Sequence, residues 1–414
     1  MGPSQEQLKI LSRFSPEPEL SRTESNFDDW LLYEFYKAYH EARKGKRTTA
    51  DEYKFELGGE MENLIVLRDE AGLRKYSPRR GIAFITRRPV SREIFAAPFS
   101  DRVIHHFLFN QVESWWDKRL DAHSYSCRKG KGTWEGVKDL RDAIWEVSKG
   151  YTREAYVIKL DIQGYFMSLA RESLMKRVDW GLTQQFKDDP AKYDLLYYLW
   201  HQIIFDDPIK GIKIRGNASD WTVLPPSKSL FCQPEGVGIV IGNLTSQLLS
   251  NIYLDQLDRY IRFTLKYKYY GRYVDDFFIV VTKDELVQAK RDIRALEIYL
   301  RSIGLVLHPK KRYIQDVRHG VSFLGVVIYP GFIVPGKRFK KQFYQAAQAV
   351  QMGRKAPEAM LSYIGFLKHI NGEKLIRQVF EEMGWEYRPG TKPWGNSLPG
   401  DKAVCGSLGW EKQG

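Results

Sequence analysis

The sequence predicts an α+β protein with two or three lobes. Three observations support this prediction. The chain has 414 residues, which exceeds an average single domain. Apolar residues recur at helical spacing in its first third and again near its end, whereas strand-like runs become prominent from Tyr156 onward. Hydrophobic residues make up 43% and aromatic residues 14% of the chain, which excludes a mostly disordered protein.

The N-terminal part is predicted to be mainly helical. Residues 1–25 show no periodicity and are expected to form a loose arm. Apolar side chains three and four residues apart then predict helices at residues 27–42 and 53–67. Two short strands are expected within residues 81–97, around Arg87-Arg88-Pro89. The same helical spacing predicts two more helices, at residues 99–116 and 134–148.

Strands enter the prediction at Tyr156. Residues 156–162 form a mostly apolar run with β-branched side chains, typical of a buried strand that ends near an acid, Asp161. Two further runs, over residues 269–281, meet at Asp275-Asp276, which we expect to occupy a hairpin turn. The other predicted elements are helices at 244–266 and 289–303, a pair of strands over 321–334, helical structure over 341–384 and an irregular tail.

The charge of the chain points to a polyanionic partner. It has 64 Lys and Arg against 51 Asp and Glu, a formal net charge of +13, together with abundant aromatic residues. This balance is typical of proteins that follow a phosphate backbone and stack on bases, although a basic surface also serves solubility. No apolar run approaches the roughly 18 residues of a membrane span, so we expect no membrane partner. Three widely spaced cysteines fit neither a disulfide framework nor a zinc site, and we expect a cytoplasmic protein.

Three acids are the candidate chemical centre. Adjacent carboxylates such as Asp275 and Asp276 repel each other, so their turn is either solvated or neutralised by cations. If a neighbouring strand brings Asp161 alongside, the three side chains offer oxygen ligands for hard divalent cations. Two Mg²⁺ ions about 4 Å apart are the usual device for in-line displacement at phosphorus.

Several motifs in register resemble those of reverse transcriptases. Tyr273-Val274-Asp275-Asp276 looks like their catalytic hairpin, and residues 161–166 (DIQGYF) are similar to their first catalytic motif. Residues 241–247 (IGNLTSQ) resemble their nucleotide-binding helix motif, which in most relatives starts with Gln-Gly and ends with Ser-Pro. The Ile-Gly start and Ser-Gln end instead resemble reverse transcriptases of diversity-generating retroelements and some bacterial defence-associated relatives. Other blocks resemble the fingers (92–106), a following fingers/palm block (124–133), the lysine motif (304–311), the primer grip (323–325) and the thumb (362–371).

The resemblance implies a right-hand polymerase with fingers, a palm built from an antiparallel sheet packed on helices, and a helical thumb. The expected divisions are an N-terminal arm (1–27), fingers and N-terminal helices (28–155), a palm (156–335) with an insertion around 205–235, a thumb (336–384) and a tail (385–414). Too few residues follow the thumb for an RNase H domain, so we expect a polymerase without added nuclease modules.

The resemblance also implies roles for individual residues. Asp161, Asp275 and Asp276 would be catalytic and hold two Mg²⁺ ions together with the main-chain carbonyl of Ile162, Asp276 contributing less directly. Lys311 would protonate the pyrophosphate as a general acid, with the adjacent Lys310 as the alternative. Nucleotide contacts are expected from Arg92, partnered by Arg87 or Arg88, and from Phe166, Gly242, Ser246 and Gln247. The expected RNA or DNA contacts are Arg128, Lys129, Lys131, Phe323, Leu324, Gly325 and Lys368.

Two of these roles have a simple physical basis. A guanidinium such as that of Arg92 offers two parallel donors to phosphate oxygens. The ring of Phe166 would lie under the incoming sugar and leave no room for a 2′-hydroxyl, which favours dNTP over NTP substrates.

The function implied is RNA-directed DNA synthesis in a diversity-generating retroelement. Its partners would be a template RNA, the RNA/cDNA duplex and a small basic accessory protein that assembles as a ring, and its errors would concentrate at template adenines. One alternative is an antiphage defence reverse transcriptase with a dedicated noncoding RNA. A second is a non-catalytic RNA-binding protein that retains the fold.

Overall fold

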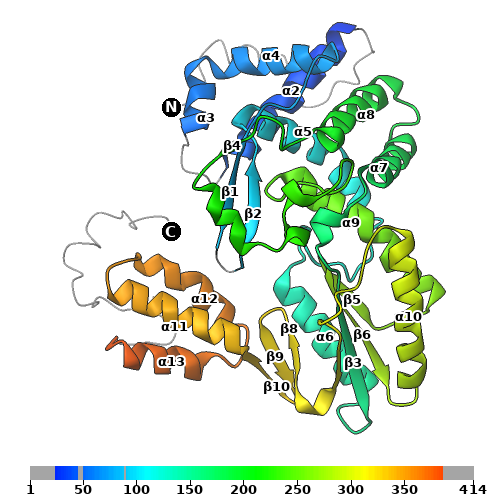
Figure 1. Cartoon of the computed structure of the whole chain (residues 1–414), viewed down its shortest axis with the longest axis vertical. Coiled ribbons are helices and arrows are strands. Elements are labelled where there is room, and N and C mark those ends of the chain that lie inside the picture. The colour runs from blue at the N-terminus through cyan, green and yellow to red at the C-terminus, as the bar shows by residue number, and fades with distance from the viewer. Residues whose placement is uncertain (1–23, 45–49, 88–89, 386–414) are drawn as a thin grey trace.

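A computed structural model describes residues 24–44, 50–87 and 90–385. Most of the predicted arm, Arg88 and nearly all of the predicted tail lie outside these residues. Figure 1 shows a mainly helical lobe at one end, a sheet with its covering helices at the other end, and the last helices of the described chain to one side. The chain therefore has the predicted α+β class, with three sheets and helices packed on them.

The helical lobe is built from amphipathic helices. On its first helix, for example, Leu31, Phe35 and Tyr39 share one buried face. Residues 53–67 were predicted as one helix, but the structure has two, because Gly58 and Gly59 interrupt the segment and Gly59 has φ +87°. The helices of this lobe are α2 (Glu24–Arg43), α3 (Ala50–Leu57), α4 (Glu60–Gly72), α5 (Phe99–Asp117), α7 (Arg171–Gln185), α8 (Pro190–Phe205) and α9 (Leu244–Arg259).

A small sheet extends this lobe. The two predicted strands are present as β1 (Ile82–Thr86) and β2 (Arg92–Ala96), and they pair antiparallel. The predicted insertion adds a third strand, β4 (Lys213–Ile214), which pairs with β1 in parallel. The insertion is thus part of this lobe's sheet and not a free loop.

The central sheet has the strand order β5-β6-β3-β7, with all neighbours antiparallel. Its strands are β3 (Ala155–Asp161), β5 (Tyr270–Tyr273), β6 (Asp276–Thr282) and β7 (Tyr313–Asp316). Alternate residues of β6 pack on opposite sides: Phe277 and Ile279 face the core that contains α9, whereas Phe278 and Val280 face α6 (Thr133–Val147). Both faces are buried, which explains the nearly continuous apolar runs in the sequence.

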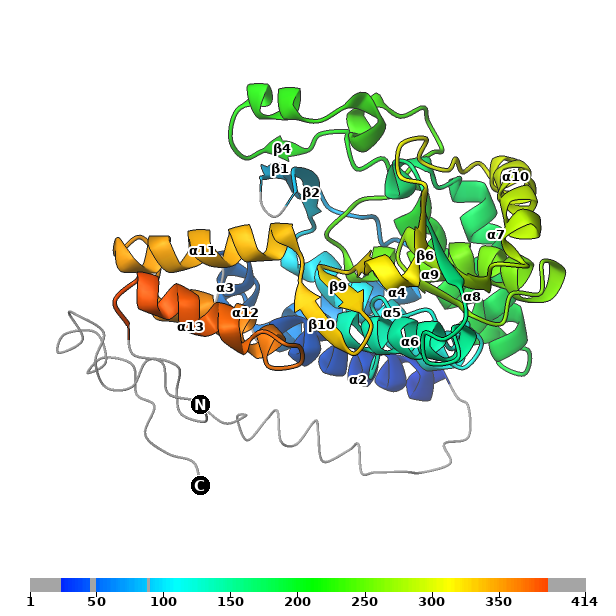
Figure 2. The same ribbon diagram turned by 90° about the horizontal axis from the view of Figure 1, so that it is seen from below.

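The last part of the chain forms a third sheet and a helical lobe. Residues 321–334 were predicted as two strands, but three are present, since tight turns at residues 324–325 and 330–331 divide the segment. They are β8 (Val321–Phe323), β9 (Val326–Tyr329) and β10 (Phe332–Pro335). Three helices follow, α11 (Lys337–Gln351), α12 (Leu361–Leu367) and α13 (Glu373–Glu382), and Figure 2 shows them projecting to one side of the sheets.

The remaining helices complete the core. Helix α10 (Leu286–Ser302) buries Leu296 and Leu300 in the main core. Helix α9 ends at Arg259, before the predicted residue 266, and passes into a π-helical turn over Tyr260–Thr264. None of the helices in the described segments combines the length and the hydrophobicity needed to cross a bilayer.

Candidate functional site

Three aspartates meet where strand β3 and the β5–β6 hairpin end. Asp161 is the last residue of β3, Asp276 is the first of β6, and the two are direct partners in the antiparallel register. Such partners have Cα atoms roughly 5 Å apart. The Ile162 N–H donates to the Asp275 carbonyl oxygen over 3.1 Å, which fastens the hairpin turn beside Asp161. The fold therefore brings the three residues to one edge of the central sheet.

The hairpin differs in one detail from the prediction. Val274 and Asp275 form the turn, whereas Asp276 already belongs to β6. Asp276 lies in the strand because it pairs with Tyr273 on one side and with Asp161 on the other. Asp276 is thereby held in the sheet, while Asp275 lies in the turn.

Burial disfavours the charged forms of two carboxyl groups in the site. Burial, and after it the negative charge of Asp161, raises the pKa of the Asp275 carboxyl to about 6. Burial also raises the pKa of Asp276, and the nearby Lys159 opposes this shift. Carboxylates in such surroundings are stabilised in their charged form by added cations.

Two carboxylate oxygens of the site are available to a cation. Asp161 Oδ1 and Asp276 Oδ1 are buried and have no hydrogen-bond partner. Unpartnered buried oxygens cost free energy, and they are the hard ligands that Mg²⁺ prefers. Within the described residues no group of three or more His, Cys, Asp and Glu side chains already has metal-binding geometry. The residues fit a divalent cation in type and exposure, without forming a ready-made cage.

Two lysines hold the other oxygens of these carboxylates. Lys311 Nζ lies 2.7 Å from Asp161 Oδ2, and its side chain is 53% exposed. The lysine whose ammonium group pairs with Asp161 is thus Lys311, so the geometry favours Lys311 over Lys310 as the lysine of the site. Lys159 Nζ lies 3.6 Å from Asp276 Oδ2. Sequence reasoning missed Lys159, although its position two residues before Asp161 on a strand places it on the same face.

The residues predicted to contact a nucleotide differ in their exposure and in their surroundings. Phe166 lies five residues after Asp161, in a 3-10 turn (Tyr165–Ser168), and packs partly buried against the core. Arg92 and Gln247 are exposed, on β2 and α9 respectively. Arg87, a possible partner of Arg92, is paired with Asp220 at 2.6 Å.

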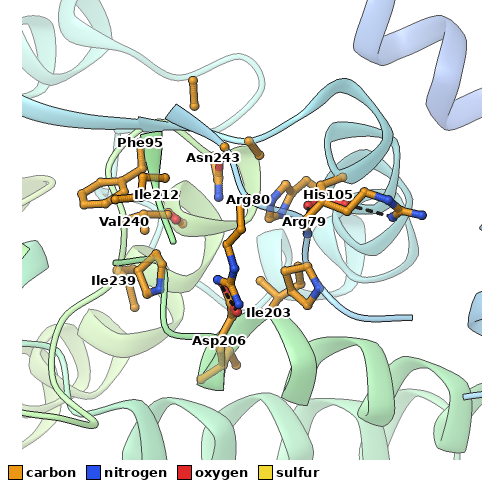
Figure 3. Close-up of a pocket in the computed structure, with 18 of the residues that line it drawn as sticks. Arg79, Arg80, Phe95, His105, Ile203, Asp206, Ile212, Ile239, Val240 and Asn243 are labelled. Carbon is orange, nitrogen blue, oxygen red and sulfur yellow. Dashed lines mark hydrogen bonds and ion pairs between the residues drawn. The ribbon is translucent and has the colours of Figure 1, made fainter. Parts of the chain in front are cut away.

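Gly242 and Ser246 face other parts of the protein. Gly242 has φ +135°, and a Cβ there would lie 2.4 Å from the Phe95 carbonyl oxygen, so this glycine permits close contact with β2. Ser246 is 4% exposed and lines a separate cavity of about 70 Å³ together with Asn243. Figure 3 shows this cavity, with Arg80 directed at Asp206, 3.1 Å away. None of the three aspartates lines it.

The residues predicted to contact RNA or DNA differ in their availability. Lys129 is exposed, and Lys131 donates to the Ala122 carbonyl oxygen. The Arg128 guanidinium turns inward to the Asp117 carboxylate at 2.6 Å and to neighbouring carbonyls, so it braces this loop.

The predicted contact residues near the β8–β9 turn also differ in their availability to RNA or DNA. Phe323 is fully buried against Phe278, whereas Leu324 and Gly325 form the turn itself. Phe323 is thus a core residue in this structure. Lys368 is exposed at the end of α12.

A family model described as reverse transcriptase (RNA-dependent DNA polymerase) matches residues 91–328, more than half of the chain. The chain belongs to the reverse transcriptase family. The matched residues include the central sheet, and helices α11, α12 and α13 lie beyond them.

Individual relatives of this reverse transcriptase-family chain are distant. It is 24% identical to Protein YkfC of Escherichia coli (strain K12) over 297 residues, which cover 63% of this chain and 70% of YkfC. Among solved structures, a C-terminally truncated apo telomerase from Candida tropicalis matches with 15% identity and a TM-score of 0.43, covering 62% of this chain and 55% of the telomerase. A Candida albicans telomerase in complex with a telomeric RNA fragment matches with 13% identity and a TM-score of 0.45, covering 75% and 55%. The chain thus spans about half the length of these telomerases.

Proposed function

We propose that this protein copies an RNA template into DNA from dNTPs, using Asp161, Asp275 and Asp276 as its metal-binding carboxylates. The observation that supports the proposal most is the register of β3 with the hairpin, which pairs Asp161 directly with Asp276 and leaves one buried oxygen on each without a partner. The family match over residues 91–328 supports the same reaction class.

The carboxylates of this site are its cation ligands. Asp161, Asp275 and Asp276, with the main-chain carbonyl of Ile162, would hold two Mg²⁺ ions. When bound, these ions would lower the pKa of the attacking 3′-hydroxyl and neutralise the triphosphate and the departing pyrophosphate.

The remaining residues of the site bind the nucleotide and move a proton. Lys311 stands beside Asp161, where its ammonium group can deliver a proton to the leaving pyrophosphate. Arg92 is the proposed triphosphate ligand on the fingers. Phe166 is the proposed steric barrier to a 2′-hydroxyl. Lys129 and Lys368 are exposed and Lys131 is partly exposed, and all three are cations suited to template or duplex phosphates.

The biological setting that we propose is a diversity-generating retroelement. Its support is the Ile-Gly start and Ser-Gln end of the motif at residues 241–247, which resembles that branch. In this setting the protein would act on a dedicated template RNA with a small basic accessory protein. Sequencing of the RNA that co-purifies with the protein, and of its cDNA, tests this proposal. Substitutions concentrated at template adenines support it, whereas faithful cDNA of a structured noncoding RNA contradicts it and favours a defence role.

The catalytic proposal is tested by removing two of the carboxylates. We expect Asp275→Asn with Asp276→Asn to abolish incorporation of labelled dNTP on a primed RNA, because the cation ligands lose their charge. The matched control is Asp284→Asn, an exposed aspartate just beyond the end of β6. Equal incorporation by the parent and the double variant excludes the proposed chemistry. RNA binding by a parent that incorporates nothing identifies a non-catalytic RNA-binding protein.

A further inference from the structure

We infer that Arg272 is a positioning residue of the candidate active site, and that its buried guanidinium holds the Val274–Asp275 turn in place from helix α9. The inference rests on the proposed function, since its consequence is the location of the Asp275 carboxylate. It assigns a role to a residue that touches neither substrate nor cation.

The turn that carries Asp275 has a strained backbone. Val274 has φ +57°, in the left-handed region. This region is disfavoured for all residues with a Cβ, and most of all for β-branched ones such as valine. A conformation of this kind persists only where the surrounding structure imposes it. Something other than the preference of Val274 itself must therefore maintain the turn.

Arg272 supplies that restraint through a fully satisfied guanidinium. The side chain is completely buried, and all five of its N–H donors have acceptors. One of them, on Nη1, donates to the Val274 carbonyl oxygen over 3.1 Å. Because a buried donor without an acceptor is costly, the guanidinium and the turn hold each other in one geometry.

The other acceptors fix the guanidinium to helix α9. Asp258, itself buried, accepts two parallel bonds of 2.7 Å from Nε and Nη2. Asn251, about two turns earlier on the same helix, accepts from Nη1 over 3.3 Å. The fork geometry of these bonds leaves the guanidinium little freedom to move. Helix α9 begins with the predicted nucleotide motif, so Arg272 links that helix rigidly to the hairpin turn.

The restraint reaches the carboxylates through one further bond. The Asp275 carbonyl oxygen, one residue beyond Val274, accepts from the Ile162 N–H. If the Val274 peptide rotates out of the left-handed region, this bond and the position of Asp275 relative to Asp161 change together. Loss of Arg272 is therefore expected to affect turnover more than nucleotide affinity.

Two substitutions in combination test the inference. Arg272→Lys retains a charge but cannot form the fork. We expect it to lower kcat for single-nucleotide addition on a primed RNA at least tenfold, with the dNTP KM changed less than threefold. In a Val274→Gly background the same substitution should lower kcat less than threefold, since glycine adopts φ +57° without strain. Equal losses in both backgrounds overturn the inference, because a general loss of stability would not depend on residue 274.

Amide hydrogen exchange gives a readout that is independent of activity. Arg272→Lys should speed exchange of the Ile162 amide at least tenfold and leave the Val280 amide, bonded to the Tyr269 carbonyl oxygen inside the sheet, within threefold of the parent. Equal acceleration of both amides indicates global destabilisation and contradicts the inference. If Arg272→Lys does not fold, Asp258→Asn is used for both comparisons, with the same expected results. If the parent protein incorporates no dNTP, the proposed function is rejected. The hydrogen-exchange experiment then still decides whether Arg272 restrains the turn.

Discussion

At the scale of single residues, few cationic side chains contact the carboxylates of the candidate site. Lys311 and Lys159 each hold one oxygen, of Asp161 and Asp276 respectively, and the other oxygen of each carboxylate has no partner. The two lysines differ in exposure: Lys311 is half-exposed and free to follow a leaving group, whereas Lys159 is mostly covered. Lys311 is therefore the better candidate for proton delivery.

Lys311→Met should lower kcat for nucleotide addition about 100-fold, which is the low end of what a general acid contributes. The rate measurement is single-turnover incorporation on a primed RNA. The control is Lys310→Met, whose side chain is exposed and whose rate should stay within threefold of the parent. A larger effect of Lys310→Met than of Lys311→Met contradicts the assignment.

At the scale of elements, the insertion is attached to strand β2 by a buried carboxylate. Glu93 on β2 is fully buried and accepts three hydrogen bonds from the insertion: from Trp221 Nε1, Ser229 Oγ and the Leu230 N–H. A carboxylate is acceptor-only, so it suits three converging donors better than any neutral side chain of its size. Glu93 lies beside Arg92, so the same contact also fixes the strand from which Arg92 projects.

Glu93→Gln should lower the free energy of unfolding by about 2 kcal/mol, because the new amide places a donor against a donor in a buried site. Urea denaturation of the full chain measures the loss. The control is Glu172→Gln on α7, an exposed position where we expect less than about 0.5 kcal/mol. If both variants lose the same amount, the three bonds to Glu93 do not hold the insertion.

Helices α5 and α9 are joined by a buried histidine that confers a pH dependence on stability. His105 Nδ1 lies 2.8 Å from Thr245 Oγ1, and burial, with the smaller effects of His106 and Arg102, lowers the pKa of His105 to about 3. A folded-state pKa below the unfolded value of about 6.5 adds stability that is complete above that pH and is lost as the pH falls towards 3.

Between pH 7 and pH 4 the protein should lose about 3 kcal/mol of unfolding free energy through His105. His105→Gln removes the titrating group and keeps a hydrogen-bonding side chain, so its loss over the same interval should be smaller by that amount. Denaturant titrations of parent and variant at several pH values provide the comparison. Identical pH profiles would show that His105 is not buried in its neutral form.

The sequence predicted elements well where local pattern and packing agree. Residues 99–116 and 156–162 match α5 and β3 closely, since their apolar positions are those that the core buries. Helices α7 and α8 were not predicted: Trp180 and Tyr197 are exposed apolar side chains that blur the helical period there. The split of residues 53–67 into two helices depends on a glycine pair whose effect a periodicity argument underweights.

The residues of the candidate site divide in the same way, into those that local sequence predicts and those whose contacts depend on the tertiary structure. Its three aspartates were predictable because they lie in short motifs next to apolar strands. The inward turn of Arg128 and the burial of Phe323 depend on Asp117 and Phe278, which are distant in sequence, and a motif does not record such contacts. Lys159 and Arg272 lie beside the motifs but outside them, and the tertiary structure reveals their contacts.

At the scale of the whole molecule, the surplus of positive charge can favour one binding surface only where its lysines and arginines are placed on that surface. The formal net charge is +13, yet many arginines are paired with acids, as Arg79, Arg87 and Arg318 are. The loop with Lys129 and Lys131 lies next to the hairpin, since Ser124 bridges to Arg272 and Thr133 Oγ1 lies 3.5 Å from the Tyr273 hydroxyl. We propose that a template strand passes this loop on its way to the aspartates, so its lysines should affect binding more than the net charge alone does.

Neutralising this loop should therefore change the salt dependence of nucleic-acid binding. Each lysine that contacts a phosphate contributes roughly 0.7 to 0.9 to the slope of log affinity against log salt, so Lys129→Gln with Lys131→Gln should reduce the slope by about 1.5. Binding of a primed RNA, measured by fluorescence anisotropy at several salt concentrations, gives the slope. The control, Lys176→Gln with Lys187→Gln, makes the same change in net charge at exposed positions in and just after α7. An equal reduction by both pairs means that binding follows the overall charge, and a reduction confined to the loop pair means that the template path runs beside the hairpin.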